Sequence, residues 1–401
     1  GWMFLLLTAQ PLILWLALGV LISGCLAWCG WQGFVWVSNT PRAEREGWYY
    51  GVISGTGGGL LPAVARFVLR IASWIYGLEV WRRNSLYDLG WKRVEHSPLP
   101  VISLGNLTTG GTGKTPFAAY VARWYRDHGV RVCFLSRGYG AREGSFNDEA
   151  LVLEQLCPDV PHLQNPDRVT SARIAHEELA SQLLILDDGF QHRRLGRDLD
   201  IVLVDALNPW GYGALLPRGL LREPVTSLRR ASLVVITRVD QAPAEQMEDI
   251  RRQIAETAPG CDFVELTFPP IRLIASTGAA GALESLRRQP VAAFCGIGNP
   301  DGFQRSLTNA GIEVVALRTF PDHHAYSRDD VESLQRWADS LDIVAIVTTQ
   351  KDLVKIQLDR LGERPLWALQ IGVEIIRGGE ILEQHLRRTL ECIPVGLPVG
   401  D

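Results

Sequence analysis

The stretch PVISLGNLTTGGTGKTP, residues 100–116, constrains the fold of this chain more than any other. Its apolar, β-branched start predicts a buried strand over residues 100–104, and a glycine-rich loop follows. From Phe117 to Tyr125 the apolar residues then recur at helical spacing. A strand, a glycine-rich loop, the pair Lys114-Thr115 and a helix together form the pattern of a phosphate-binding P-loop.

The loop predicts a site for the phosphates of a nucleotide. Glycines allow successive backbone N–H groups to turn inward around a phosphate, and the helix start adds partial positive charge. Lys114 would reach the β- and γ-phosphates, and the Thr115 hydroxyl would ligate Mg²⁺. The strict pattern has glycine where this chain has Thr108, but neighbouring glycines offer the same freedom. The predicted phosphate-binding residues are Thr108, Thr109, Gly110, Gly111, Thr112, Gly113, Lys114 and Thr115.

The rest of the chain alternates apolar strands with helical segments. Such alternation predicts an α/β fold of the P-loop NTPase type, with a doubly wound, mainly parallel sheet and a second, smaller α/β lobe. We expect a kinase core over residues 100–275 and a C-terminal lobe over 276–401, with the seam near 270–290. The expected strands are 131–136, 183–186, 201–204, 233–237, 291–295, 314–316 and 343–348.

The first 38 residues contain no charged side chain. A segment of this length can cross a bilayer, because roughly 20 apolar residues suffice. We therefore expect a hydrophobic membrane segment over residues 1–44, as one span or as a tight hairpin. A signal peptide is the competing interpretation, but no basic segment precedes the run. Arg42 and Arg45 follow directly and favour a cytoplasmic location for what comes next.

A second apolar stretch lies within residues 45–99, which we expect to form an amphipathic, membrane-associated helical region. In residues 60–83 Arg66 and Arg70 share one helical stripe with Ser73 and Gly77, while apolar residues lie opposite. Two arginines disfavour a span, so a helix lying in the membrane interface is preferred over an ordinary helix packed on the core. Residues 1–100 hold eight basic and five acidic side chains, which suits an anionic membrane surface.

Composition narrows the class of protein further. The chain of 401 residues is 47% hydrophobic and can bury a core, and its net charge of −4 argues against a nucleic-acid partner. The seven cysteines show no metal-ligand spacing except Cys25 and Cys29, which lie inside the apolar run. Nothing in this usage demands an oxidising compartment.

A second acidic motif follows a buried strand. The run 183–186 ends at Asp187-Asp188-Gly189. Downstream of a P-loop, a carboxylate at the carboxyl end of such a strand is typical of a Walker-B-type ligand of Mg²⁺. Asp187 and Asp188 are therefore predicted metal-binding residues.

Seven motifs occur in an order that resembles the tetraacyldisaccharide 4'-kinases of lipid A biosynthesis. They are GNLTTGGTGKTP, SRGYG, NDEA, LDDGFQHRRL, LLPRGLLREP, FPDHHAYS and TTQKDLVKI, and they cover roughly residues 60–385. The resemblance implies ATP- and Mg²⁺-dependent phosphorylation of the 4'-hydroxyl of a tetraacylated glucosamine disaccharide 1-phosphate, giving lipid IVA. It also implies the cytosolic face of the inner membrane, contact with membrane lipids and no obligate protein partner.

The resemblance further assigns residues by motif. The general base would be Asp148, assisted by His323, with Lys114 on the phosphates; His324 is the alternative partner, and a solvated helix cap before Ser327 is the alternative role for the histidine pair. Glu149 would join the metal shell. Thr348 to Asp352 would line the nucleotide base. The implied substrate-contacting residues are Asn106, Arg137, Tyr139, Gln191, His192 and Arg222.

Two other functions remain open at this stage. Thr237-Arg238-Val239-Asp240 follows a predicted strand and is similar to the guanine-reading [NT]KxD element, which makes a membrane-tethered GTPase switch an alternative. Arginine in place of the lysine weakens it. A transport ATPase subunit is the third candidate, although the chain lacks an ABC-type signature.

Overall fold

The computed structural model describes residues 42–138 and 148–393. The chain divides into two compact units, residues 1–63 and Val64–Asp401. The first contains α2 (Arg42–Ser54), and α3 (Leu60–Asp88) runs across the boundary. The hydrophobic segment expected over residues 1–44 lies almost entirely outside the described residues.

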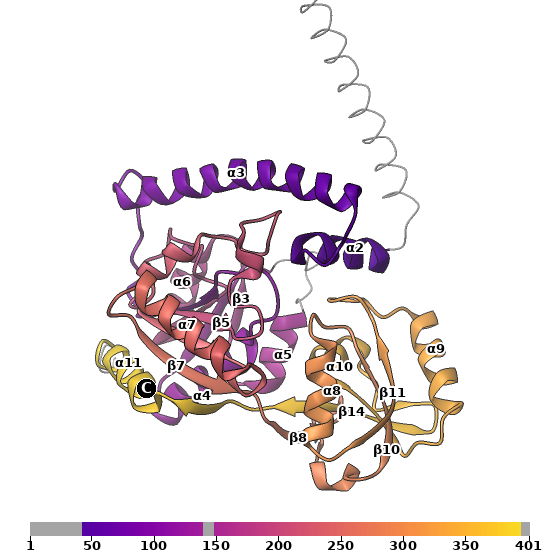
Figure 1. Ribbon diagram of the computed structural model, residues 1–401. Helices are drawn as coiled ribbons and strands as arrows, with labels where there is room; N and C mark the ends of the chain where they lie inside the picture. The colour runs from indigo at the N-terminus through magenta and orange to yellow at the C-terminus, as the bar shows by residue number, and fades with distance from the viewer. Residues whose placement is uncertain (1–41, 139–147, 394–401) are drawn as a thin grey trace, which may run out of the picture. The chain divides into compact units, whose positions relative to one another are not determined.

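An eight-stranded sheet holds the glycine-rich loop (Figure 1). Seven of its strands run parallel and β15 pairs with β7 in the antiparallel direction. Its strands, in spatial order, are β15 (Glu374–Arg377), β7 (Asp262–Thr267), β6 (Leu233–Thr237), β5 (Leu199–Asp205), β1 (Val101–Asn106), β4 (Leu183–Asp187), β2 (Val132–Ser136) and β3 (His162–Gln164). The central strands are buried throughout because helices cover both faces.

Alternate residues of each strand face opposite layers of helices. On β1, Ile102 and Leu104 pack with α4 (Lys114–Asp127) and α11 (Gly379–Glu391), whereas Val101 packs with α6 (Arg168–Glu177). The α6 side of the sheet also carries α7 (Ala244–Thr257). The doubly wound arrangement predicted from the alternating pattern is confirmed, and it brings the ends of β1 and β4 to the same edge.

A second, smaller sheet follows in the chain. Its order is β11 (Glu313–Thr319), β10 (Pro290–Cys295), β12 (Ala345–Thr349), β14 (Arg364–Ile371), β8 (Pro270–Ile274) and β9 (Ala280–Gly281), and β13 (Arg360–Leu361) pairs with β14. One face packs against α8 (Pro300–Asn309), and the other packs against α9 (Arg328–Asp339) and α10 (Gln350–Ile356).

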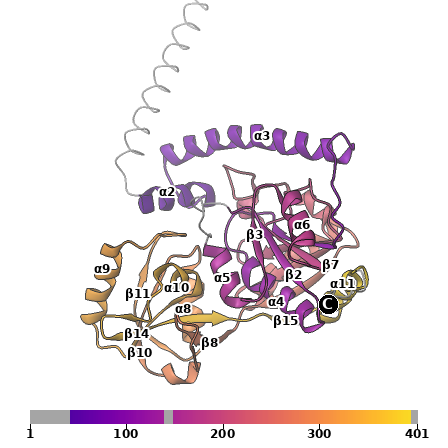
Figure 2. The same cartoon turned by 180° about the vertical axis from the view of Figure 1, so that it is seen from behind.

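The division of the strands between the two sheets does not follow the expected boundary between residues 275 and 276. β8 belongs to the second sheet although it precedes that point, and β15 with α11 returns to the first. Figure 2 shows this last segment in yellow, leaving the second sheet at β14 and reaching α11. The return has a packing reason, because Leu382 and Leu386 of α11 fill the core under β7. The domain boundaries themselves stay a prediction.

Within the second unit, α3 makes polar contacts along one side. The Ser73 hydroxyl donates to the Leu215 carbonyl at 2.9 Å, and the Tyr76 hydroxyl donates to the Arg222 carbonyl at 3.0 Å. The other side carries exposed apolar residues at helical spacing, namely Leu60, Leu61, Val64, Phe67, Val68, Ile71, Trp74, Ile75, Leu78 and Trp81. Within the described part of the chain, α3 alone is long and apolar enough to cross a membrane.

Candidate active site

The glycine-rich loop begins where β1 ends and finishes at the start of α4. Gly113 lies directly before α4 with a φ of 86°, a left-handed conformation that favours glycine. A Cβ built there would lie 2.2 Å from the ring of Phe268, so the loop has no room for a side chain at this position. The fourth residue before it, Thr109, is held by its backbone N–H, which donates to the Leu220 carbonyl at 2.8 Å.

The Thr-Arg-x-Asp element braces this loop. The Thr237 hydroxyl donates to the carbonyl of Thr112 at 3.0 Å, and Arg238 donates to the carbonyl of Gly111 at 2.7 Å. The Asp240 carboxylate accepts a hydrogen bond from Thr267 at 2.6 Å. Arg238 also pairs with Asp205. These contacts give the motif a structural role in supporting the loop. The motif therefore no longer favours a guanine-reading site.

Lys114 lies at the first position of α4 with its ammonium directed into the site. Its Nζ donates to Oδ1 of Asn106 at 3.2 Å and lies 3.5 Å from Oδ1 of Asp188. Asn106 is fully buried, and its own amide donates to the Thr108 carbonyl at 2.7 Å. The end of β1 therefore orients the lysine before any ligand arrives.

Asp188 and Arg222 form a two-pronged ion pair beside Lys114. Both terminal nitrogens of the Arg222 guanidinium, Nη1 and Nη2, donate to the Asp188 carboxylate, each at 2.8 Å, and Nη2 also contacts Asn106. Burial opposes ionisation of Asp188, but the hydrogen bond from Arg222 and the charge of Lys114 hold its pKa well below the usual range. The site thus contains a permanent carboxylate between two cations.

The neighbouring Asp187 has the opposite environment. It is buried at the end of β4, and its Oδ1 has no hydrogen-bond partner among the described residues. Burial and the charge of Glu149 raise its pKa to about 7, although Lys114 acts against this. A buried carboxylate beside a second carboxylate is a suitable place for a cation, and oxygen ligands suit Mg²⁺.

Among the described residues, no group of three or more His, Cys, Asp or Glu side chains could hold a metal ion by itself. Thr115, Asp187, Asp188 and Glu149 remain the predicted protein ligands of Mg²⁺.

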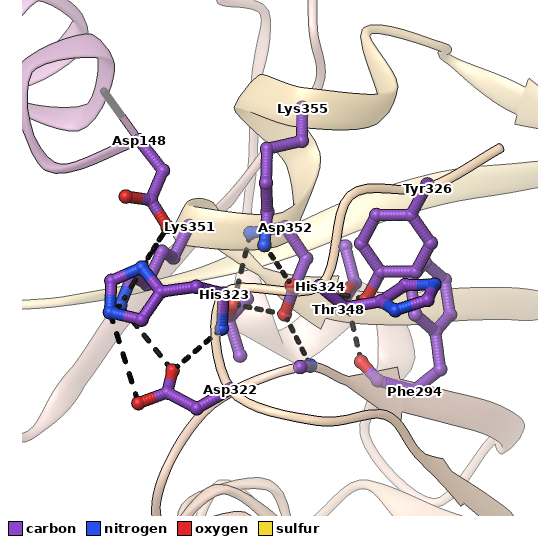
Figure 3. A network of polar contacts seen from close by, with 12 residues as sticks. Asp148, Phe294, Asp322, His323, His324, Tyr326, Thr348, Lys351, Asp352 and Lys355 are labelled. Carbon is purple, nitrogen blue, oxygen red and sulfur yellow. Dashed lines mark hydrogen bonds and ion pairs between the residues drawn. The ribbon is translucent and has the colours of Figure 1, made fainter. Parts of the chain in front are cut away.

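Asp148 and His323, which are far apart in the sequence, lie in contact (Figure 3). Asp148 begins α5 (Asp148–Leu156), and its Oδ2 lies 2.9 Å from Nδ1 of His323. The hydrogen bond that His323 donates to the Asp148 carboxylate raises the pKa of His323, while burial and the charge of Lys351 act against this. Burial opposes ionisation of Asp148, but His323 and Lys351 lower its pKa below the usual value. The structure therefore brings together the two residues that the resemblance assigned to the base.

His323 itself has a strained backbone. Its φ is 59°, a left-handed conformation that is uncommon for a residue with a side chain. The Asp322 carboxylate accepts a hydrogen bond from the His323 N–H at 3.0 Å and stabilises this turn. Strained backbones of this kind cluster at functional sites.

His324 occupies a different environment. Its Nε2 lies 3.1 Å from Oδ2 of Asp330, the residue that forms a capping box with Ser327 at the start of α9. The two roles predicted for the histidine pair therefore fall to different residues. His323 contacts Asp148, and His324 contacts the helix cap. The catalytic role of His323 stays a prediction.

The prediction that Thr348 to Asp352 lines the nucleotide base is wrong for the ends of that run. Thr348 and Asp352 are completely buried. The Thr348 hydroxyl donates to the Phe294 carbonyl at 2.9 Å, and Asp352 accepts hydrogen bonds from Gly296, Tyr326 and Thr349. Both side chains are used inside the lobe because they connect β12 and α10 to β10.

The predicted substrate residues lie in several places. Gln191 donates to the Asn106 carbonyl at 3.0 Å, and burial with the charge of Arg168 lowers the pKa of His192 to about 4. Arg137 is exposed at the end of β2. Tyr139 lies outside the described residues. Arg222 pairs with Asp188, and Oδ1 of Asn106 accepts hydrogen bonds from Arg222 and Lys114.

The sequence analysis missed Arg168, and it included Lys351 only within the run Thr348 to Asp352 that was expected to line the nucleotide base. Arg168, at the start of α6, is 6% exposed, and its Nε has no partner among the described residues. Burial lowers its pKa while the charges of Asp188 and Asp187 raise it, which places the guanidinium near both. Lys351, in the first turn of α10, lies 3.2 Å from Nε2 of His323. An arginine following Asn-Pro-Asp at a helix start was the available signal for the first, and the motif TTQKDLVKI was the signal for the second.

Comparison with known proteins now identifies the fold and the reaction. The family model described as tetraacyldisaccharide-1-P 4'-kinase matches residues 65–391. The chain belongs to this family. A tetraacyldisaccharide 4'-kinase from Anaeromyxobacter sp. (strain K) is 40% identical over 85% of this chain and 95% of that protein. One from Chlorobaculum parvum is 36% identical over 84% of this chain and 98% of that protein.

A solved structure of the family agrees with the fold. The crystal structure of LpxK from Aquifex aeolicus, in complex with ATP, is 33% identical and has a TM-score of 0.67, covering 81% of this chain and 99% of that one. This chain is therefore a lipid A 4'-kinase, and the GTPase and transport ATPase alternatives are not favoured.

Proposed function

We propose that this kinase transfers the γ-phosphate of ATP, with Mg²⁺, to the 4'-hydroxyl of a tetraacylated glucosamine disaccharide 1-phosphate, giving lipid IVA. The observation that carries the proposal is the contact of Asp148, at the start of α5, with His323. The next residue of α5, Glu149, raises the pKa of Asp187. These contacts support a proposal in which the base and a metal ligand follow one another on α5.

The loop residues 108–115 would bind ATP as a P-loop. Their backbone N–H groups and the start of α4 favour the triphosphate, and Lys114 supplies a fixed charge to the β- and γ-phosphates. Arg222 and Asn106 are already oriented toward Lys114 and Asp188, so in this chain they suit the nucleotide phosphates better than the lipid. Arginine is suited to such contacts because its fork pairs with two oxygens.

Magnesium would be held by Thr115 and Asp187, with Glu149 nearby. The unpartnered Oδ1 of Asp187 supports this assignment, since a buried carboxylate oxygen requires a partner. The ion would supply charge neutralisation on the phosphates. Asp188 is less suited to a direct ligand, because Arg222 occupies both of its oxygens.

The transfer itself needs a proton acceptor. Asp148 would accept the proton of the 4'-hydroxyl while that oxygen bonds to the γ-phosphorus and the bond from phosphorus to the β-γ bridging oxygen breaks, releasing ADP. His323 would hold the carboxylate in place through its Nδ1–H. The lysine and arginine charges stabilise the phosphoryl group during transfer without reorganising, which is a large source of rate enhancement.

The lipid would approach from the membrane side. Arg168, Arg137, Gln191 and His192 are the proposed contacts of its polar head, and the exposed apolar side of α3 would lie in the interface of the inner membrane, on the cytosolic face. Deleting residues 1–40 should leave phosphate transfer largely intact if α3 suffices for contact with the bilayer. A truncated enzyme that binds ATP but fails only on the lipid acceptor would instead place the first segment in the substrate site.

The decisive experiment is transfer of ³²P from ATP to a purified disaccharide 1-phosphate in detergent micelles. The expected product is a 4'-phosphate that appears only with the lipid acceptor, ATP and Mg²⁺. The same assay with GTP serves as the control for the nucleotide. A strong preference for GTP, or ATP hydrolysis that is indifferent to the acceptor, would contradict the proposal.

A further inference from the structure

Two adjacent side chains at the end of β6 bind two adjacent carbonyl groups of the glycine-rich loop. The Thr237 hydroxyl donates to the Thr112 carbonyl at 3.0 Å, and Nη2 of Arg238 donates to the Gly111 carbonyl at 2.7 Å. Thr237 and Thr112 are 0% and 2% exposed, so water has no access to replace this hydroxyl. The loop is thus tied to the end of β6 at two consecutive peptide groups.

The contact of Thr237 determines where a backbone N–H of the loop points. A peptide group is planar and trans, so its N–H is directed opposite to its C=O. Because the Thr112 carbonyl is directed at Thr237, the N–H of Gly113 is directed to the opposite side of the loop. Gly113 is left-handed, with φ 86° and ψ 21°, and Lys114 begins α4. Such a change of hand turns successive N–H groups toward one point, where they bind an anion. That anion site consists of the N–H groups of residues 113–115, and Thr237 fixes the first of them.

Arg238 holds the preceding part of the loop. Its guanidinium also pairs with the Asp205 carboxylate at the end of β5, so the cation is fixed from two sides. The φ of Arg238 is 59°, which is uncommon for a residue with a side chain. The N–H of Thr112 donates to the Gly110 carbonyl at 3.1 Å, which closes this part of the loop into a tight turn.

We propose that Thr237 and Arg238 are positioning residues for the nucleotide, which hold the loop so that the N–H groups of residues 113–115 meet the β-phosphate. The inference deepens the proposed function and rests on the binding of the ATP phosphates by this loop. In this scheme neither side chain touches the nucleotide, because each is engaged with a loop carbonyl. They act on affinity, since a loop that already has its bound conformation loses less conformational freedom when the ligand binds.

Thr348, in the second sheet, offers a matched control for Thr237. It lies near the end of β12, is 0% exposed, and its hydroxyl donates to the Phe294 carbonyl at 2.9 Å. Thr237→Val and Thr348→Val each replace one buried hydroxyl by a methyl group and remove a hydrogen bond to a backbone carbonyl. Only the first of these hydrogen bonds reaches the glycine-rich loop.

A second pair of variants tests the arginine. Arg238→Lys keeps a positive charge beside Asp205 but lacks the planar fork that serves the carboxylate and the loop carbonyl together. Arg131→Lys is its control, because Arg131 also donates to a backbone carbonyl, that of Ala180 at 2.6 Å. Since the side chain of Arg238 is 17% exposed, this pair stays informative even where Thr237→Val does not fold.

The binding test compares ADP, which has a β-phosphate, with AMP, which has none. Both are measured by displacement of fluorescent N-methylanthraniloyl-ADP from the full-length enzyme in detergent with Mg²⁺. Thr237→Val should raise the Kd of ADP by about 3- to 10-fold, the usual effect of losing one hydrogen bond, and change the Kd of AMP by less than about twofold. Arg238→Lys should act in the same direction. Thr237→Ser keeps the hydroxyl and should bind ADP like the native enzyme, as should both controls.

Three results would overturn the proposal. They are a native Kd of ADP in Thr237→Val and Arg238→Lys, an equal weakening of ADP and AMP, which indicates general damage to the fold, or an equal weakening of ADP in Thr348→Val. Lys114→Ala is measured beside these variants. If Lys114→Ala also keeps the native Kd of ADP and the native kcat, the loop is not the phosphate site and the proposed function fails. If Lys114→Ala loses both while Thr237→Val and Arg238→Lys lose neither, only the positioning role is wrong.

Discussion

Replacing Glu223 should reveal how firmly α3 is tied to the active site. This carboxylate is completely buried and accepts three hydrogen bonds, from Arg83 at 2.9 Å, from Asn84 at 3.0 Å and from Arg230 at 2.8 Å. Arg83 and Asn84 belong to α3, whereas Glu223 directly follows Arg222, which pairs with Asp188. One buried anion therefore connects α3 with the segment that carries Arg222.

The contribution of Glu223 to the free energy of unfolding can be estimated from the burial of its two arginine partners. Glu223→Gln preserves the shape but leaves two guanidinium groups without their anion, and breaking a buried ion pair costs about 3 to 5 kcal/mol. The side chains of Arg83 and Arg230 are 32% and 21% exposed, so water can partly replace the carboxylate. The lower end applies, and we expect the free energy of unfolding to fall by about 3 kcal/mol.

The assay is urea unfolding in detergent, followed by tryptophan fluorescence. The matched control is Glu79→Gln on the same helix, because Glu79 pairs with Arg82 where both side chains are largely exposed, and its loss should not be measurable. Glu223→Gln should also lower kcat, because the contacts of Glu223 hold the backbone next to Arg222 in place. Superimposable unfolding curves for Glu223→Gln and the native enzyme would refute the reasoning.

Three further predictions concern the site and the core. Lys114→Ala should lower kcat by orders of magnitude with an unchanged circular dichroism spectrum, since oriented charge contacts to the transferred group are worth on the order of 3 kcal/mol or more; retained turnover would show that the loop is not catalytic. Asp148→Ala and His323→Ala should each cost several orders of magnitude in kcat, the double variant should be scarcely worse, and His324→Ala should be mild, because residues that act as a unit are non-additive; losses that multiply would contradict this pairing. Burial lowers the pKa of His162 to about 4, so its protonation favours the unfolded chain, and stability should fall with decreasing pH between about 6.5 and 4, by at most about 1.4 kcal/mol per pH unit; thermal unfolding of His162→Asn should show a weaker dependence over that range.

The local pattern of this chain determined its main sheet. The apolar run before Gly105 and the helical spacing from Phe117 depend on neighbours within one strand or one helix, so β1 and α4 were predictable from the residues themselves. The same holds for Asp187, because a carboxylate at the end of a buried strand next to β1 must lie at the loop's edge of the sheet. Burial and side-chain period are properties that a short sequence carries.

Strands with weaker patterns required the tertiary structure. β15 has only four residues, three of them exposed, and it pairs with β7 although more than a hundred residues separate them. No local period indicates such a partner, because the hydrogen bonds that define the strand come from elsewhere in the chain. The assignment of β8 to the second sheet has the same cause.

The site shows the same division. Lys114 and the glycine-rich loop could be predicted as a phosphate site because the residues involved are eight consecutive positions of the sequence. The position of Lys351 against Nε2 of His323, and that of Arg222 against Asp188, could not be predicted from residues 28 and 34 positions apart. Hydrogen bonds act over about 3 Å, so side chains from different elements become partners only when packing brings those elements together.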